Sequence, residues 1–186
     1  NHGGITTLHS PDDFIYDYIY NYGDTIYGMS GNDVIIGDRY DTFSQDYGYD
    51  RLYGDDGNDA IYGDTGPEDP DWKTTLHTGS GNVLVGGYGR DTVWGGGGAN
   101  GDYIYGDLEE YGPGTTDGGS DFLFGLGGND YIYGGGGNDY IDGGADNDGS
   151  LNGGVGNDTM RGGLGNDYMY GGAGSDMFVA DAGDDY

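Results

Sequence analysis

The segment from Gly125 to Asp142 repeats one nine-residue pattern twice, as Gly-Leu-Gly-Gly-Asn-Asp-Tyr-Ile-Tyr and Gly-Gly-Gly-Gly-Asn-Asp-Tyr-Ile-Asp. The first six residues of each unit disfavour a helix, because a Gly in a helix interior loses about 1 kcal/mol relative to Ala. The last three place one apolar residue, Ile132 or Ile141, between two residues that point the opposite way. Each unit therefore predicts one turn followed by one three-residue strand.

The same pattern recurs along most of the chain, and each interruption falls in a turn rather than in a strand. The units are degenerate before Gly28 and complete from there on. We expect, in order, an N-terminal cap with degenerate repeats, a repeat domain and a C-terminal cap, over residues 1–27, 28–179 and 180–186. Loop insertions into the repeat domain are expected at about residues 40–47, 66–78 and 109–118.

The composition disfavours an ordinary globular core, since 46 of 186 residues are Gly and only 33% are hydrophobic. The formal net charge of -29 is typical of disorder. The aromatic content of 15%, the regular Ile and Val spacing and the 31 Asp against 3 Glu oppose disorder. A tight turn that binds a hard cation favours Asp, whose short carboxylate tolerates turn geometry. The sign of the charge excludes nucleic acid as a partner, and no apolar run approaches the roughly 20 residues of a membrane span.

The units resemble Gly-Gly-x-Gly-x-Asp-x-U-x, with U a large apolar residue, which is the repeat of the RTX (hemolysin-type calcium-binding) family. The resemblance covers roughly Gly28 to Val179 in thirteen frames. It implies an all-β fold, a right-handed parallel β-roll in which two nonapeptides make one coil. It also implies that Ca²⁺ lies between turns stacked on the same edge, held by Asp carboxylates and turn carbonyls. About seven two-strand coils are expected.

Elementary packing leads to a similar arrangement, because strands this short must stack about 4.8 Å apart into two parallel sheets. The apolar residue of each strand then points between the sheets. One sheet is expected to contribute Ile35, Ile61, Val93, Leu123, Ile141, Met160 and Phe178. The other is expected to contribute Ile26, Leu52, Leu84, Ile104, Ile132, Leu151 and Met169. Such a thin core cannot offset the entropy of ordering so many glycines, so we expect bound cations to supply the difference.

Alternate turns place the Asp residues in two columns, one on each edge of the roll. One column holds Asp33, Asp59, Asp91, Asp121, Asp139, Asp158 and Asp176. The other holds Asp24, Asp50, Asn82, Asp102, Asp130, Asp148 and Asp167. Like charges about 5 Å apart repel by several kcal/mol at an effective dielectric near 20, unless a cation lies between them. Seven turns on each edge leave about six gaps, hence on the order of a dozen Ca²⁺ ions. The alternative, aspartates that only shape solvated turns, leaves the register of the two columns unexplained.

The candidate metal-binding residues are the column residues of the repeat domain and, through the carbonyls that the resemblance implies, the first glycines of its repeats. The side-chain candidates are Asp33, Asp50, Asp59, Asn82, Asp91, Asp102, Asp121, Asp130, Asp139, Asp148, Asp158, Asp167 and Asp176. The glycine candidates are Gly28, Gly54, Gly86, Gly125, Gly134, Gly143, Gly153, Gly162 and Gly171. Sites with dissociation constants of about 10⁻⁴ to 10⁻³ M are typical of extracellular modules. The chain would then be unfolded in a calcium-poor cytoplasm and folded outside the cell. We therefore expect a secreted, extracellular protein, which is compatible with association with the cell surface.

The outward strand positions carry many aromatic or apolar residues. On one sheet these are Tyr53, Val85, Tyr103, Tyr105, Tyr131, Tyr133, Tyr168 and Tyr170; on the other they are Val34, Ile36, Tyr62, Trp94, Phe122, Phe124 and Tyr140. Exposed ladders of such side chains either stiffen the sheet by cross-strand stacking, mediate assembly, or form a platform for a polysaccharide. The sequence favours a non-catalytic, self-assembling component of a surface or matrix, such as a filament or an adhesin.

The competing class is an enzyme, since RTX repeats also form C-terminal calcium-binding secretion and folding modules of proteases, lipases or polysaccharide epimerases. A polysaccharide-binding module is a further alternative. We find no catalytic set in these residues: His2, His9 and His77 lack the spacing of zinc ligands, and Ser80 lacks the strand-to-helix elbow of a hydrolase. The carboxylate pairs are interpreted as metal ligands rather than as a glycosidase pair. Ice binding is disfavoured because the turns carry no column of Thr.

Overall fold

The computed structural model describes residues 5–7, 14–16, 25–37, 49–63, 81–107, 118–179 and 181–186, with the backbone alone at 5–7 and 14–16. These residues form strands and turns and no helix. The odd-numbered strands are β1 (Ile5–Thr7), β3 (Thr25–Tyr27), β5 (Arg51–Asp56), β7 (Val83–Tyr88), β9 (Tyr103–Tyr105), β11 (Tyr131–Gly136), β13 (Ser150–Val155) and β15 (Met169–Ala173). The even-numbered strands are β2 (Phe14–Tyr16), β4 (Val34–Ile36), β6 (Ala60–Tyr62), β8 (Thr92–Gly96), β10 (Phe122–Gly127), β12 (Tyr140–Ala145), β14 (Thr159–Leu164) and β16 (Met177–Val179).

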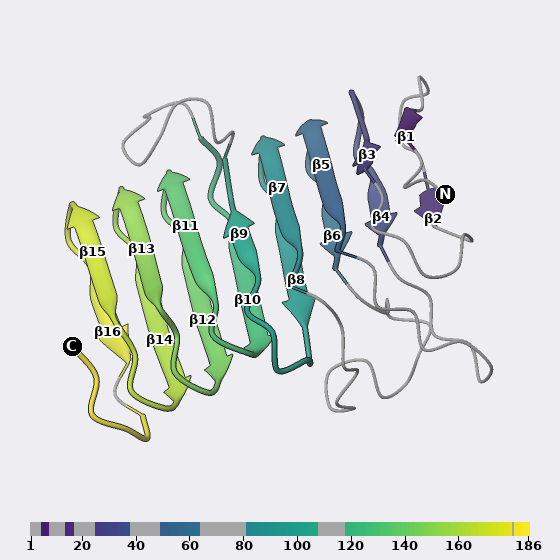
Figure 1. The fold of residues 1–186 in the computed structure, drawn as a ribbon. Coiled ribbons are helices and arrows are strands. Elements are labelled where there is room, and N and C mark those ends of the chain that lie inside the picture. The colour runs from purple at the N-terminus through teal and green to yellow at the C-terminus, as the bar shows by residue number, and fades with distance from the viewer. Residues whose placement is uncertain are drawn as a thin grey trace.

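The strands form two parallel sheets of eight, with the odd-numbered strands in one sheet and the even-numbered strands in the other. Consecutive strands thus alternate between the sheets, and each turn carries the chain from one sheet to the other (Figure 1). The predicted all-β parallel β-roll is therefore confirmed. It extends to eight strands in each sheet because β1 and β2 pair in register with β3 and β4.

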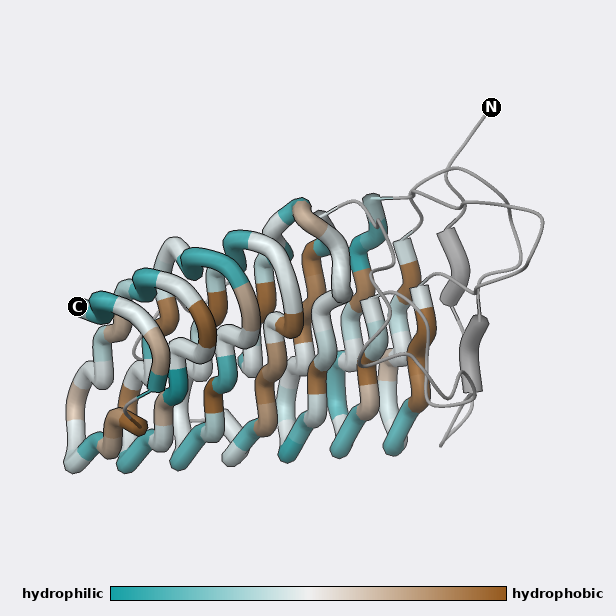
Figure 2. Tube along the Cα trace, turned by 90° about the horizontal axis from the view of Figure 1, so that it is seen from below, coloured by the Kyte–Doolittle hydropathy of each residue, from teal (hydrophilic) through white to brown (hydrophobic). Residues whose placement is uncertain are grey.

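The core is one side chain thick on each sheet, as the sequence predicts. Successive central residues pair in register, for example Ile104 with Ile132 and Ile132 with Leu151. Figure 2 shows the result, with hydrophobic positions recurring at the same place on successive coils. The core consists of Ile26, Ile35, Leu52, Ile61, Leu84, Val93, Ile104, Leu123, Ile132, Ile141, Leu151 and Met160, with Met169 partly buried against it.

The prediction for Phe178 is wrong, because this residue is 50% exposed although it continues the register of Met160. Its strand, β16, is the last one of its sheet. No strand among the described residues covers its far side, so the core position is open there. Met177 and Val179 beside it are exposed as well.

The predicted strand length of three residues is wrong for most of the roll. Strands such as β11 run for six residues and include the first glycines of the following turn. Gly135, at φ 105°, pairs with Gly154, at φ 104°, in the same ladder. Glycine adopts this left-handed backbone without a Cβ clash, so pairing continues beyond the apolar triplet into the turn.

Three of the outward residues that the sequence places on exposed ladders are buried instead. Ile36, Tyr62 and Val85 are 0%, 7% and 1% exposed. Val85 pairs in register between Tyr53 and Tyr105, so a short side chain lies between two taller ones. The outward face is therefore packed from one strand to the next, and only part of it is open to a partner.

The predicted loop insertions lie outside the described residues, except for Gly118. The same holds for the degenerate frame over residues 17–24, including Asp24 of the second column. The proposed division into caps and repeat domain stays a prediction.

Candidate metal centre

On one edge of the roll, the turns that lead into the even-numbered strands stack their Asp residues in a continuous column. Each backbone N–H donates to Oδ1 of the Asp one coil further on, over distances between 2.8 and 3.1 Å. The column consists of Asp33, Asp59, Asp91, Asp121, Asp139, Asp158 and Asp176. All members before Asp176 are buried. The structure thus brings the predicted residues of this edge together.

The opposite edge repeats the arrangement with one amide in the column. The members are Asp50, Asn82, Asp102, Asp130, Asp148, Asp167 and Asp185, joined by hydrogen bonds of 2.6 to 3.1 Å. Oδ1 of Asn82 accepts from Asp50 in the same way as a carboxylate oxygen would. Asp185 was missed because the sequence Ala-Asp-Ala-Gly-Asp-Asp-Tyr at residues 180–186 does not open with the glycines of a repeat. It does keep the Gly-x-Asp of the turn, which is the signal that could have found it.

The second carboxylate oxygen of most column residues has no partner. Oδ2 is buried without a hydrogen bond in Asp59, Asp91, Asp121, Asp130, Asp139, Asp148, Asp158 and Asp167. A buried carboxylate oxygen that lacks a donor is strongly unfavourable unless it is protonated or bound to a cation. The described turns therefore present a regular series of oxygens that require a positive charge.

The first glycine of each turn lies beside this oxygen. A Cβ added to Gly28 would lie 2.5 Å from Oδ2 of Asp33 and 2.7 Å from the carbonyl oxygen of Gly54 on the next coil. The same overlap with an Asp Oδ2 recurs at every glycine that the sequence assigns to the metal sites: Gly28, Gly54, Gly86, Gly125, Gly134, Gly143, Gly153, Gly162 and Gly171. Only glycine leaves this space open, so carboxylate and carbonyl oxygens line one cradle in each of these turns except the last two, at Gly162 and Gly171, where only the carboxylate is close.

Four more glycines occupy the equivalent place and were missed because their repeats are interrupted. These are Gly37, Gly63, Gly95 and Gly106, which neighbour Asp50, Asn82, Asp102 and Asp121. Each of them is the first residue of its repeat, directly after the strand of the preceding repeat. They could therefore have been found from the sequence despite the inserted residues.

Burial in the columns raises the pKa of the carboxyl groups, and backbone donors lower it only in part. Desolvation is the largest cause in every case, and the neighbouring carboxylates add to it. The pKa is raised to about 8 for Asp91, Asp121, Asp139 and Asp148, to about 7 for Asp130 and to about 6 for Asp59. Without a cation, these groups therefore favour the neutral form far above the ordinary carboxyl range.

The donor set fits a hard cation. The described residues contain no group of three or more His, Cys, Asp or Glu side chains that could hold one ion. A cation in these turns would therefore be held by column carboxylates together with turn carbonyls. Calcium accepts six to eight oxygen ligands, including backbone carbonyls and water, in flexible geometry. When bound, it would supply positive charge beside the buried Oδ2 atoms.

Parts of a second ladder of hydrogen bonds run along both edges in the opposite direction, and sequence reasoning missed them. At several turns the residue before the column Asp donates its N–H to the side chain one coil earlier, as Asn157 does to Asn138 at 2.7 Å and Asn166 does to Asn147 at 2.8 Å. The repeated Asn-Asp pair in the sequence was the available signal. These turns are thus bonded to both of their neighbours by side chains of adjacent residues.

Asp107 is a further buried carboxylate outside the two columns. It accepts from the N–H of Gly136 at 2.6 Å and from that of Gly119 at 3.3 Å. Burial raises its pKa. Because Gly119 lies just beyond the predicted insertion, Asp107 joins the far end of that segment to the roll.

The fold and the stacked turns together define a calcium-binding β-roll. The family described as RTX calcium-binding nonapeptide repeat (4 copies) matches residues 18–39, 46–67, 77–108, 115–149 and 152–186. The chain therefore belongs to the RTX calcium-binding nonapeptide repeat family. No curated protein and no solved structure matches the chain. No helix in the described part of the chain is long and apolar enough to cross a bilayer.

The raised pKa values predict that acid can replace calcium. The folded roll binds more protons than the unfolded chain, whose carboxyl groups titrate near 3.8. Their stabilising contribution is therefore fully present below about pH 4 and is lost as the pH rises through 6 to 8. In buffer freed of calcium beforehand, we expect the strand signal in circular dichroism, absent at about pH 8, to return as the pH falls to about 5. A strand signal that stays absent at about pH 5 would contradict the buried, cation-free carboxylates.

Proposed function

We propose that this chain is a secreted β-roll that folds when it binds on the order of a dozen Ca²⁺ ions. The observation that carries the proposal is the series of buried Oδ2 atoms without a hydrogen bond, most of them in a turn that also presents a glycine carbonyl of the next coil. Calcium that binds only the folded state stabilises it by mass action. Secretion is typical of RTX proteins, and a calcium-rich exterior would then drive folding outside the cell.

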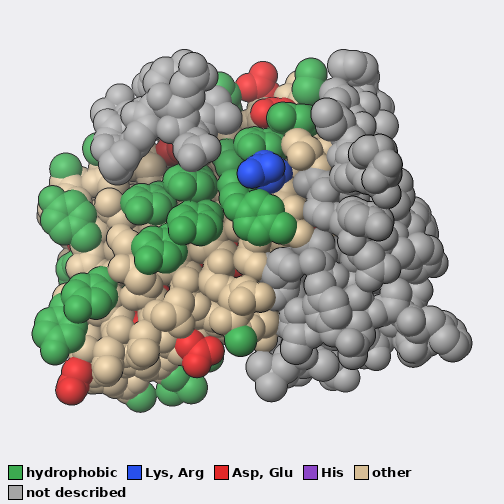
Figure 3. Space-filling view, in the orientation of Figure 1, with side chains coloured by type: hydrophobic (Ala, Val, Ile, Leu, Met, Phe, Trp, Pro, Cys, Tyr) green, Lys and Arg blue, Asp and Glu red, His purple; other side chains and the backbone are tan. Residues whose placement is uncertain are grey.

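The outer face of the odd-numbered sheet favours self-assembly as the role of the folded roll. Tyr103 stacks on Tyr131 with ring centroids 5.1 Å apart, and Tyr105 stacks on Tyr133 at 5.3 Å. Tyr103 and Tyr131 are 41% and 37% exposed. Figure 3 shows hydrophobic side chains gathered on the face seen there. Apolar, aromatic patches of this kind are typical of interaction surfaces.

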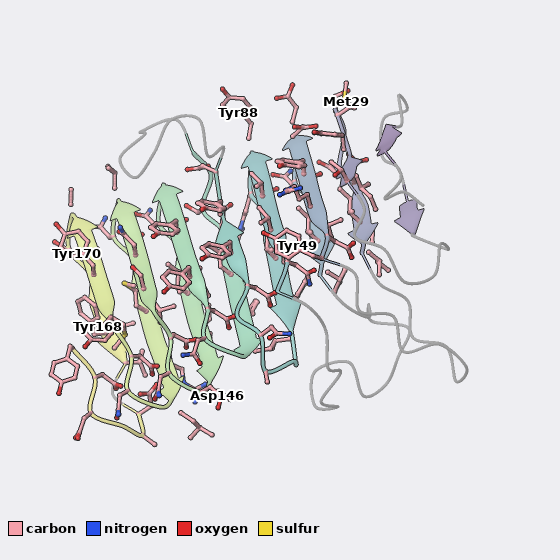
Figure 4. The ribbon with its side chains drawn as sticks, in the orientation of Figure 1. Met29, Tyr49, Tyr88, Asp146, Tyr168 and Tyr170 are labelled. Carbon is pink, nitrogen blue, oxygen red and sulfur yellow. The ribbon has the colours of Figure 1, made fainter. Side chains whose placement is uncertain are left out.

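The exposed rings become more prominent toward the C-terminal end of this face. Tyr168 and Tyr170, which flank Met169 at β15, are 60% and 66% exposed (Figure 4). Tyr103 and Tyr131, like Tyr105 and Tyr133, turn their ring faces toward each other and leave their edges to a partner. Edges with phenol hydroxyls suit a second protein surface better than the apolar face of a sugar. We therefore propose a non-catalytic, self-assembling component of a cell surface or matrix.

A calcium-binding module of a larger secreted enzyme is the second candidate. The RTX repeats themselves support it, since such repeats also occur in that context. The two candidates differ in what the isolated chain does in calcium, because only the first requires association between copies.

We expect the chain, of 19.5 kDa, to form particles larger than a monomer in millimolar Ca²⁺. Light scattering after gel filtration and electron microscopy measure this directly. The double variant Tyr168→Ser/Tyr170→Ser should reduce assembly at least tenfold in the protein concentration required, equivalent to about 1.4 kcal/mol. The matched control is Tyr88→Ser, which removes a ring that is 41% exposed at the end of β7. A folded wild-type monomer under all these conditions would reject self-assembly and favour the module.

A further inference from the structure

The outer face of the even-numbered sheet carries a cavity that the calcium-binding turns do not use. Its volume is about 180 Å³, and it is lined by Phe124 and Leu126 from β10, Asp142 and Gly144 from β12, and Arg161 from β14. Because β12 lies between β10 and β14, the cavity is a trough across one strand. Gly144 has no side chain to fill it. The volume is below the roughly 300 to 1,000 Å³ of pockets for drug-sized ligands, so it suits a single ring.

An aromatic ladder ends at this trough. Tyr62 stacks on Trp94 at 4.5 Å between ring centroids, and Trp94 stacks on Phe124 at 5.7 Å. The ring planes of both pairs are nearly parallel. The next residue in register is Asp142, so the ladder stops there. Tyr140 meets Phe124 only at a tilt of 48°. Rings within the ladder cover each other's faces, whereas the terminal ring keeps part of one face for a ligand.

The opposite wall of the trough is polar. A guanidinium nitrogen of Arg161 lies 3.3 Å from Oδ2 of Asp142, and its Nε lies 3.5 Å from Oδ2 of Asp181. The Asp181 side chain is only 10% exposed, and its Oδ1 is buried without a hydrogen bond. Carboxylates only accept hydrogen bonds and a guanidinium only donates them. A hydroxyl group, which does both, matches such a pair.

We propose that this trough binds one pyranose ring of a neutral polysaccharide. The apolar face of the sugar would lie against Phe124, and its hydroxyl groups would bond to Asp142 and Arg161. Two carboxylates face one guanidinium here, so the surroundings of the trough keep a net negative charge even when the turns hold calcium. This local charge disfavours uronates and other anionic sugars. The inference rests on the calcium-folded roll of the proposed function, but not on its self-assembly.

Leu126 supports this assignment through its position. It has φ 75°, and its partner in register, Gly144, has φ 113°. The RTX repeat has glycine at the position of Leu126, because the left-handed region disfavours a side chain. Met29 and Asp55 depart from the repeat in the same way, at φ 80° and 70°, so it is the place of the Leu126 side chain on the trough wall that sets it apart. Replacing it by glycine should keep the fold while removing one wall.

The test measures binding of soluble dextran, β-1,3-glucan and galactomannan in millimolar Ca²⁺, with carboxymethyl dextran as the anionic control. Affinity electrophoresis gives the dissociation constants. Fluorescence of Trp94, which stacks on Phe124, reports local binding in a Trp72→Phe background, where it is the only tryptophan. We expect at least one neutral polymer to bind and carboxymethyl dextran not to bind. Leu126→Gly and Arg161→Gln should each weaken that binding at least tenfold. Tyr88→Ser, a change on the other sheet, should leave it unchanged.

Circular dichroism in calcium first establishes that each variant is folded, which separates failure of this proposal from failure of calcium-dependent folding. Folded wild-type protein that binds none of the neutral polymers would overturn the proposal. So would binding of carboxymethyl dextran as tight as neutral binding, or a folded Leu126→Gly variant with wild-type affinity. Binding that is lost in both trough variants and retained in Tyr88→Ser would support it.

Discussion

Removal of calcium by EGTA at about pH 8 is expected to unfold the roll almost completely. The core is one side chain thick on each sheet, and the two edges hold columns of buried carboxylates. Ionised and cation-free, these carboxylates would repel each other in a poorly solvated environment. The strand signal in circular dichroism should disappear, and the radius of gyration from X-ray scattering should rise toward the roughly 46 Å of an unfolded chain of this length.

Readdition of millimolar Ca²⁺ should restore both signals, whereas the same concentration of Mg²⁺ should not. Magnesium demands near-octahedral geometry and loses its water reluctantly, so turns rich in carbonyl oxygens bind it poorly. A strand signal that survives chelation at this pH would contradict the proposal that cations hold the roll together.

The substitution Asp139→Asn is expected to have opposite effects with and without calcium. Oδ1 of Asp139 accepts from the N–H of Asp121 at 2.9 Å, and an amide oxygen can replace it, as Asn82 shows on the other edge. The variant therefore keeps the hydrogen-bond ladder and loses only the carboxylate. In a calcium titration followed by circular dichroism, we expect the folding midpoint to rise at least tenfold, equivalent to about 1.4 kcal/mol.

In EGTA at about pH 8 the same variant should be more stable than the wild type, because it removes a buried group whose pKa is raised to about 8. The compact state can be forced with the osmolyte TMAO, and the variant should fold at a lower TMAO concentration. The reverse substitution, Asn82→Asp, is the matched control and should require more TMAO than the wild type. Equal behaviour of Asp139→Asn and wild type in both conditions would mean that this column only shapes the turns.

The sequence predicts the core and the columns well because both follow the nine-residue period. Counting residues in the repeat is enough to place Ile132 and Asp130 in their ladders. It also places Asn82 correctly, although a long insertion precedes it. Insertions confined to turns do not shift the side-chain alternation of the strands. Whether the two columns bind calcium as assigned stays a prediction, although the family and the buried oxygens both favour it.

Other features depend on which strands become neighbours and where each sheet ends, and the nine-residue period does not contain this information. Phe178 occupies a core position, but it belongs to the last strand of its sheet and has no covering neighbour. The sequence shows Leu126 and Asp142 as variations of two separate repeats, and only the stacking of β10 on β12 brings them to one trough. Asp185 was missed because its repeat does not open with glycines.

The paired ladders of the turns, one pointing up the roll and the other pointing down, bind each coil to its two immediate neighbours and to nothing else. The molecule should therefore behave like a one-dimensional stack in which order spreads from coil to coil. Opening should begin at an end, where a coil has a neighbour on one side only, and amide hydrogen exchange should slow progressively toward the middle. Calcium ions would then bind one coil after another rather than all at once, and each bound ion would make binding at the next coil more favourable.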